Sequence, residues 1–159
     1  MTHTKLAWLF EILWLAFTAL LTLLVLTPVI GTINNEYLTN NAVFIFLTVT
    51  FFRLFLFVKR VPYLSKMWMR VVLIGILGVL FFQFLISIQD FLWDMDNATI
   101  SRFLTPEKSF EHSQATIDTY YYFKSEFILF ATACEIMTLL LAVRLVISMW
   151  QYGPKAMNH

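Results

Sequence analysis

The chain has 159 residues, of which 60% are hydrophobic and only 13% are charged, with a formal net charge of +1. Soluble domains average roughly 45–50% apolar and 25% charged residues, and a soluble chain of this length could not bury so much apolar surface. The composition therefore excludes an ordinary soluble enzyme, a disordered chain and a nucleic-acid-binding protein. One cysteine, Cys134, excludes an intramolecular disulfide framework and a thiolate zinc site. An integral membrane protein remains.

Four segments are long and apolar enough to cross a bilayer as helices, which takes about 20 residues. We expect spans near residues 6–29, 42–58, 71–88 and 120–150. The first segment is interpreted as a retained anchor because its apolar stretch exceeds the roughly 7–15 residues of a signal peptide. The predicted fold is all-α, a four-transmembrane-helix bundle in a single membrane domain of residues 1–159. It has a short connection on one side and a longer outer loop, residues 89–119, on the other.

Basic and acidic residues are concentrated in loops on opposite sides of the expected membrane. The connection between the second and third spans contains four basic residues and no acid: Lys59, Arg60, Lys66 and Arg70. Acidic residues gather in the two loops of the opposite side: Glu36, Asp90, Asp94, Asp96, Glu107, Glu111 and Asp118. Lysine and arginine favour cytoplasmic loops. We therefore expect both termini in the cytoplasm, and we expect the protein in a bacterial inner (cytoplasmic) membrane.

Three charged residues share one layer of the expected bundle: Glu11, Arg53 and Arg144. At 1.5 Å per residue, each lies roughly 8–9 Å inside the cytoplasmic end of its span. Charges inside a span are costly and normally face protein or water. A salt-bridged cluster of Glu11 with one or both arginines is the expected arrangement. Arginines reaching the headgroups and a proton or ion pathway are the alternatives.

A second polar group lies nearer the outer surface and comprises Gln83, Glu126 and Glu135. Glu135 precedes Arg144 by nine residues, about half a turn around the helix axis, so the two side chains face opposite sides. The fourth span is therefore expected to pack on both sides, one side being an interface between chains. Gln83 is the candidate partner of Glu135. Glu126 is expected at the outer interface, within reach of water.

The sequence lacks the residues that several kinds of catalytic or cofactor site require. The histidines, at positions 3, 112 and 159, lie outside the spans, which excludes bis-histidine haem ligation in the bilayer. No Glu-x-x-His pattern of a di-metal bundle occurs, and neither a nucleotide-binding loop nor a nucleophile motif is present. We therefore expect no catalytic residue, no metal site and no cofactor.

The sequence favours a non-catalytic structural or accessory subunit of a larger membrane complex, packing through the fourth span and the outer loop. Its expected partners are the lipid bilayer and other membrane subunits or copies of itself, without nucleic acid. The alternative is a small oligomeric ion or proton channel or transporter that uses the intramembrane charges. A membrane enzyme using Asp90, Asp94, Asp96 and His112 has the least support.

Overall fold

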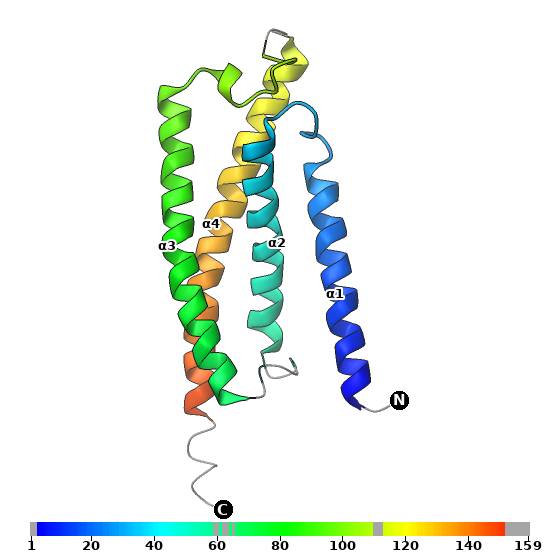
Figure 1. Cartoon of the computed structure of the whole chain (residues 1–159), viewed down its shortest axis with the longest axis vertical. Helices are drawn as coiled ribbons and strands as arrows, with labels where there is room; N and C mark the ends of the chain where they lie inside the picture. The colour runs from blue at the N-terminus through cyan, green and yellow to red at the C-terminus, as the bar shows by residue number, and fades with distance from the viewer. Residues whose placement is uncertain (1–2, 59–60, 62–63, 65, 110–112, 152–159) are drawn as a thin grey trace, which may run out of the picture.

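The computed structural model describes residues 3–58, 61, 64, 66–109 and 113–151. Four long helices account for most of them (Figure 1): α1 His3–Leu26, α2 Asn35–Phe57, α3 Met67–Asn97 and α4 Gln114–Trp150, with a short 3-10 turn, η2 Ile100–Arg102. Each long helix is apolar enough and long enough to cross a membrane. Within the described ranges, extended pairing is limited to one isolated bridge, between Ile33 and Leu104. The all-α fold with four candidate spans is confirmed.

The helices run past the apolar segments that predicted them. α3 has 31 residues and α4 has 37, about 47 and 56 Å at 1.5 Å per residue, against a hydrocarbon core of about 30 Å. α2 begins at Asn35 rather than 42 because the Asn34 side chain accepts a hydrogen bond from the Glu36 amide. The expected outer loop 89–119 therefore shrinks to residues 98–113. Hydropathy predicts the apolar length, whereas capping groups determine where a helix begins.

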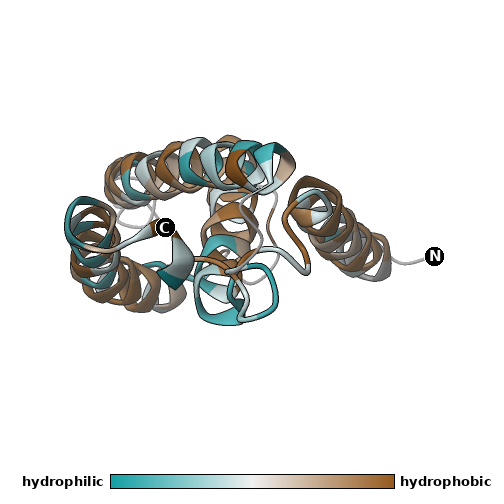
Figure 2. Cartoon of the chain, turned by 90° about the horizontal axis from the view of Figure 1, so that it is seen from above, coloured by the Kyte–Doolittle hydropathy of each residue, from teal (hydrophilic) through white to brown (hydrophobic). Residues whose placement is uncertain are grey.

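The four helices do not form a symmetrical bundle. α4 packs against both α2 and α3, whereas α1 packs mainly along α2, and Figure 2 shows α1 beside the other three helices. Aromatic rings fill the space that α2, α3 and α4 enclose: Phe91 stacks on Phe127 with ring centroids 3.8 Å apart, and Phe44 lies 5.4 Å from both Phe84 and Phe127. The protein is a three-helix core with α1 attached along one edge.

The α3–α4 connection closes one end of this core. Its backbone pairs with the α1–α2 loop, because the Asn34 amide donates to the Phe103 carbonyl at 2.8 Å and the Thr105 amide donates to the Thr32 carbonyl at 2.9 Å. Phe103 is fully buried there. The beginning of α1, the end of α2, the beginning of α3 and the end of α4 lie at the opposite end (Figure 1), because successive helices run in opposite directions. We call that end of the molecule the basic end, because Lys66 and Arg70 lie there at the beginning of α3.

Candidate functional site

Glu11 of α1 and Arg53 of α2 form a bidentate ion pair, in which each guanidinium Nη donates to one oxygen of the carboxylate. The two side chains are only 13% and 12% exposed. The Arg53 guanidinium also lies over the Trp14 ring, 5.7 Å from its centroid. Planar, two-bond recognition of a carboxylate is the geometry that arginine provides best. The structure thus brings together two of the three charges that the sequence placed in one layer.

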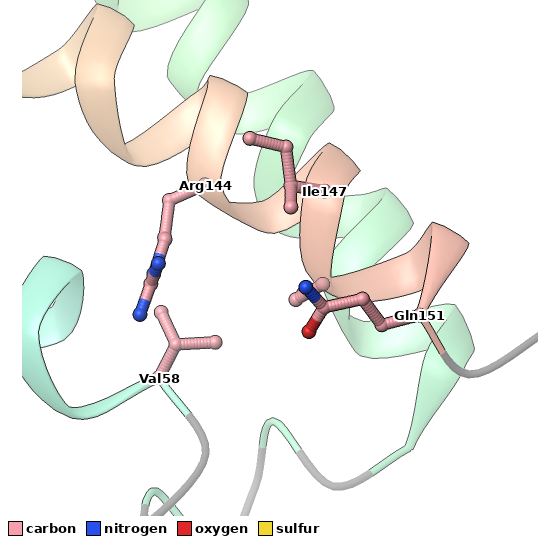
Figure 3. A pocket seen from close by; sticks show the side chains of 5 residues that line it. Val58, Arg144, Ile147 and Gln151 are labelled. Atoms are coloured by element: carbon pink, nitrogen blue, oxygen red, sulfur yellow. The ribbon is translucent and has the colours of Figure 1, made fainter.

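Arg144 does not join that pair. Its side chain is exposed on α4, and its guanidinium lies 5.8 Å from the Phe55 ring centroid. It lines a small pocket with Val58 and Gln151 (Figure 3). The expected three-residue cluster is therefore incomplete. Equal depth in the bilayer does not fix which way a helix face turns, and α1 packs mainly on α2 rather than on α4.

Glu126 of α4 is buried against Asn41 of α2. The Asn41 side-chain amide donates to Glu126 Oε1 at 3.2 Å, and the two residues are 0% and 6% exposed. The expectation that Glu126 reaches water is wrong, because its face of α4 turns toward α2. Asn41 Oδ1 and Glu126 Oε2 are both buried without a hydrogen-bond partner among the described residues. Sequence analysis missed Asn41 because it placed that residue in a loop before the second span.

Gln83 and Glu135 are not brought together. Gln83 is exposed on α3 and Glu135 is half-buried on α4. Two threonines of α1 bond to its own backbone: Thr18 Oγ1 donates to the Trp14 carbonyl at 3.0 Å, and Thr22 Oγ1 donates to the Thr18 carbonyl at 2.9 Å. Back-bonding of this kind is common for threonine in helices. It engages both hydroxyls within α1.

Of the aspartates near the end of α3, Asp94 has a structural role in this fold. Asp94 accepts a hydrogen bond from the Tyr37 hydroxyl at 2.7 Å and forms an ion pair with Arg102 at 2.9 Å. It therefore connects α3 to α2 and to η2. Asp90 and Asp96 are exposed, and His112 lies outside the described residues. Within the described part of the chain, no three His, Cys, Asp or Glu side chains gather in a way that could hold a metal ion.

The seam between α1 and α2 is hollowed along much of its length. One hollow, of about 500 Å³, is lined by small and apolar side chains: Ala19, Thr22, Leu23, Thr39, Ala42, Val43, Phe46 and Leu47. A second, of about 290 Å³, lies toward the basic end and includes the ion pair: Trp8, Glu11, Ile12, Trp14, Leu15, Thr50 and Arg53. On α1 and on α2 alike, lining residues of the two hollows follow one another at three- and four-residue spacing. Such spacing keeps to one helix face, so the hollows form one groove, which we call the α1–α2 groove.

Comparison of the chain with family models, with curated proteins and with solved structures gives no match, so packing, charge and burial are the observations that bear on its function.

We predict that Glu11 and Arg53 are energetically coupled. Glu11→Gln or Arg53→Gln alone should lower the free energy of unfolding by about 2 kcal/mol, less than the roughly 3–5 kcal/mol of a fully buried pair. The double variant should lose clearly less than the sum of the two single losses. Unfolding of the purified protein in mixed detergent micelles measures these values. Additive single and double losses would contradict the coupling.

We also predict that Asn41 matters because it supplies a donor to a buried carboxyl group. Asn41→Leu should cost about 1–3 kcal/mol of stability, since it leaves Glu126 without that donor. Glu126→Gln should cost less stability. The glutamine side chain keeps an oxygen that accepts from the Asn41 amide, and its own amide can donate a hydrogen bond to Asn41 Oδ1. Thermal unfolding of both variants tests the order, with Asn40→Leu as control because Asn40 is the exposed neighbour of Asn41 on α2. A larger loss for Glu126→Gln than for Asn41→Leu would refute this role.

Proposed function

We propose that this protein is a non-catalytic structural or accessory subunit of a larger membrane complex, inserted in a bacterial inner (cytoplasmic) membrane with both termini in the cytoplasm. The charge distribution supports this orientation. The connection from α2 to α3 carries basic residues without acids, and short basic loops stay on the cytoplasmic side. The beginning of α1 and the end of α4 lie at that same basic end (Figure 1).

The observation that carries the proposal is the α1–α2 groove. Association of transmembrane helices relies on close packing, and small residues allow backbones to approach. The larger hollow presents such residues from both walls, Ala19 and Thr22 on α1 and Thr39 and Ala42 on α2. A helix from another subunit would fill a surface that the chain's own four helices leave hollow.

The length of the groove favours a helix over a lipid tail. Its lining residues extend from Trp8 to Leu23 on α1 and from Thr39 to Arg53 on α2, about 21–22 Å at 1.5 Å per residue. One leaflet provides only about half of the roughly 30 Å hydrocarbon core. A lipid from a single leaflet therefore covers part of the groove, whereas a transmembrane helix can follow all of it.

The proposed main contact with the partner is therefore the α1–α2 groove and not α4. The sequence predicted contacts between chains through the fourth span and the outer loop. α4 is already packed by α2 and α3 within the chain, while the α1–α2 groove has no such cover. We therefore propose the groove as the main contact with the partner, and the face of α4 that carries Glu135 as a second contact.

Transport is the weaker proposal. A small oligomeric channel or transporter would use Glu135, Gln83 and the layer of charged residues as parts of its ion or proton route: Glu11, Arg53 and Arg144. Glu11 is engaged by Arg53, and Gln83 faces out of the core on α3. These positions favour packing over conduction. Proton or ion flux by the purified protein in liposomes, abolished by Glu135→Gln, would reverse this preference.

We predict that filling the groove separates the protein from its partner. Val43→Trp places a large ring in the groove, where Val43 is 46% exposed, and should abolish co-purification of partner subunits with the tagged chain. Val79→Trp is the matched control, because Val79 is 64% exposed on α3, away from the groove. Solubilisation in native lipid followed by mass spectrometry of the bound chains measures the loss.

The control variant should retain every partner that the unmodified chain retains. Two results would contradict the proposal: an unmodified chain that purifies from native lipid as an unpartnered monomer, or equal retention of partners by both tryptophan variants. Thermal unfolding of both variants distinguishes a lost contact from a lost fold.

A further inference from the structure

We propose that Glu126 carries a proton in the folded protein and that its carboxyl group exchanges two hydrogen bonds with the side-chain amide of Asn41. The Asn41 amide donates to Glu126 Oε1 at 3.2 Å, and the protonated Glu126 Oε2 donates to Asn41 Oδ1 in return. The pair joins α2 to α4, which pack against each other in the three-helix core (Figure 1). This inference depends neither on the α1–α2 groove nor on the subunit proposal.

The first argument is that two buried oxygen atoms are left without a hydrogen bond. Asn41 Oδ1 and Glu126 Oε2 have no partner among the described residues, and the two residues are only 0% and 6% exposed. Buried polar atoms nearly always have a partner, because an unmade hydrogen bond costs the atom its contact with water. Two acceptors cannot bond to each other. A single proton on Oε2 turns one of them into a donor and satisfies both.

The second argument is the shape of the two groups. An amide carries its oxygen and nitrogen on one carbon, and a carboxyl group carries its two oxygens in the same way. When the two groups are coplanar, the hydrogen bond from Asn41 Nδ2 to Glu126 Oε1 places the remaining atoms, Oδ1 and Oε2, next to each other. A protonated carboxyl group can then both accept and donate. A carboxylate would instead direct its negative charge at the amide oxygen.

The third argument is that α2 and α3 present no cation to Glu126 within the described part of the chain. Neither of the two ion pairs there includes Glu126. On α2, Tyr37 lies one turn before Asn41, and its hydroxyl donates to Asp94 of α3 at 2.7 Å. Asp94 is in turn paired with Arg102. A buried carboxyl group without a cation is more stable in its neutral form.

The neighbours of Glu126 on α4 do not supply a positive charge either. Tyr122, one turn earlier, is the titratable group of α4 that interacts with Glu126, and its hydroxyl donates to a backbone carbonyl of α1 at 3.4 Å. Lys124 precedes Glu126 by two residues, about 200° around the helix, and therefore faces away from it. Phe127, the next residue, stacks on Phe91 of α3. A neutral Glu126 also avoids the cost of a charge inside a membrane span.

Infrared spectroscopy of the full-length protein in liposomes tests the proton directly, because a protonated carboxyl group has a C=O band that a carboxylate lacks. The spectrum is recorded at about pH 6, where an exposed glutamate is almost fully ionised. Glu126→Gln should remove the intensity of one carboxyl group from this band. Glu36→Gln is the matched control and should leave the band unchanged, because Glu36 is exposed at the start of α2.

Asn41→Leu should keep the Glu126 band and shift it to higher frequency, because the O–H and C=O groups both lose their partner. A band of equal intensity in the unmodified chain and in Glu126→Gln would overturn the proposal, since it would show that Glu126 is ionised. A band that Asn41→Leu does not shift would also overturn it, because the proton would then not be shared with Asn41.

The pH dependence of unfolding is a second measurement, which does not require Asn41→Leu to fold. Above about pH 5 a glutamate in the unfolded chain has largely released its proton, whereas the folded chain retains the proton on Glu126. Raising the pH from about 5 to about 7 should therefore lower the folding equilibrium constant of the unmodified chain, relative to that of Glu126→Gln, by up to about tenfold per pH unit. Glu36→Gln should follow the unmodified chain. Unfolding in mixed detergent micelles measures these constants, and the same pH dependence in the unmodified chain and in Glu126→Gln would refute the proposal.

Discussion

The bidentate ion pair between Glu11 and Arg53 is the interaction on which the position of α1 depends. Each charge would be costly in the bilayer alone, and the two groups satisfy each other with little exposure. α1 packs mainly along α2, so this pair fixes both the height and the rotation of α1 on α2. The α1–α2 groove follows from that placement, because its walls are the faces of α1 and α2 flanking the pair. A shifted α1 would present a different surface to a partner.

The two arginines buried or half-buried in different seams show how one residue type serves two purposes. Arg53 is neutralised within the chain and joins two helices. Arg70 donates its Nε to the Leu64 carbonyl at 2.7 Å and an Nη to Ser148, so it ties the α2–α3 connection to the end of α4. Arg144 is exposed on α4, with its guanidinium 5.8 Å from the centroid of the Phe55 ring. Arg53 and Arg70 therefore both join helices, one through an ion pair and the other through hydrogen bonds.

Hydropathy and helical spacing were sufficient to predict four helices and to select Glu11 and Arg53 as residues at equal depth. They could not predict that Arg144 would stay apart, because depth along a helix says nothing about which neighbour its face contacts. Asn41 was missed for a similar reason: a polar residue in a polar stretch gave no signal that α2 begins at Asn35 and buries it against Glu126. The positions of Arg144 and Asn41 depend on packing between helices, and the pattern of a single helix does not reveal that packing.

Occupancy of the α1–α2 groove by a partner helix is tested by comparing the groove in the purified protein with the groove in native membranes. A photo-reactive benzophenone side chain is introduced at Ala19, which lines the groove, and is irradiated in liposomes of the purified protein and in native membranes. The same probe at Val79, which is 64% exposed on α3 and away from both proposed contacts, is the control. We predict that the probe at Ala19 cross-links to another chain in native membranes and not in liposomes of the purified protein, while the probe at Val79 gives the same products in both. The same cross-linked products from Ala19 in the two settings would show that no partner helix lies in the groove.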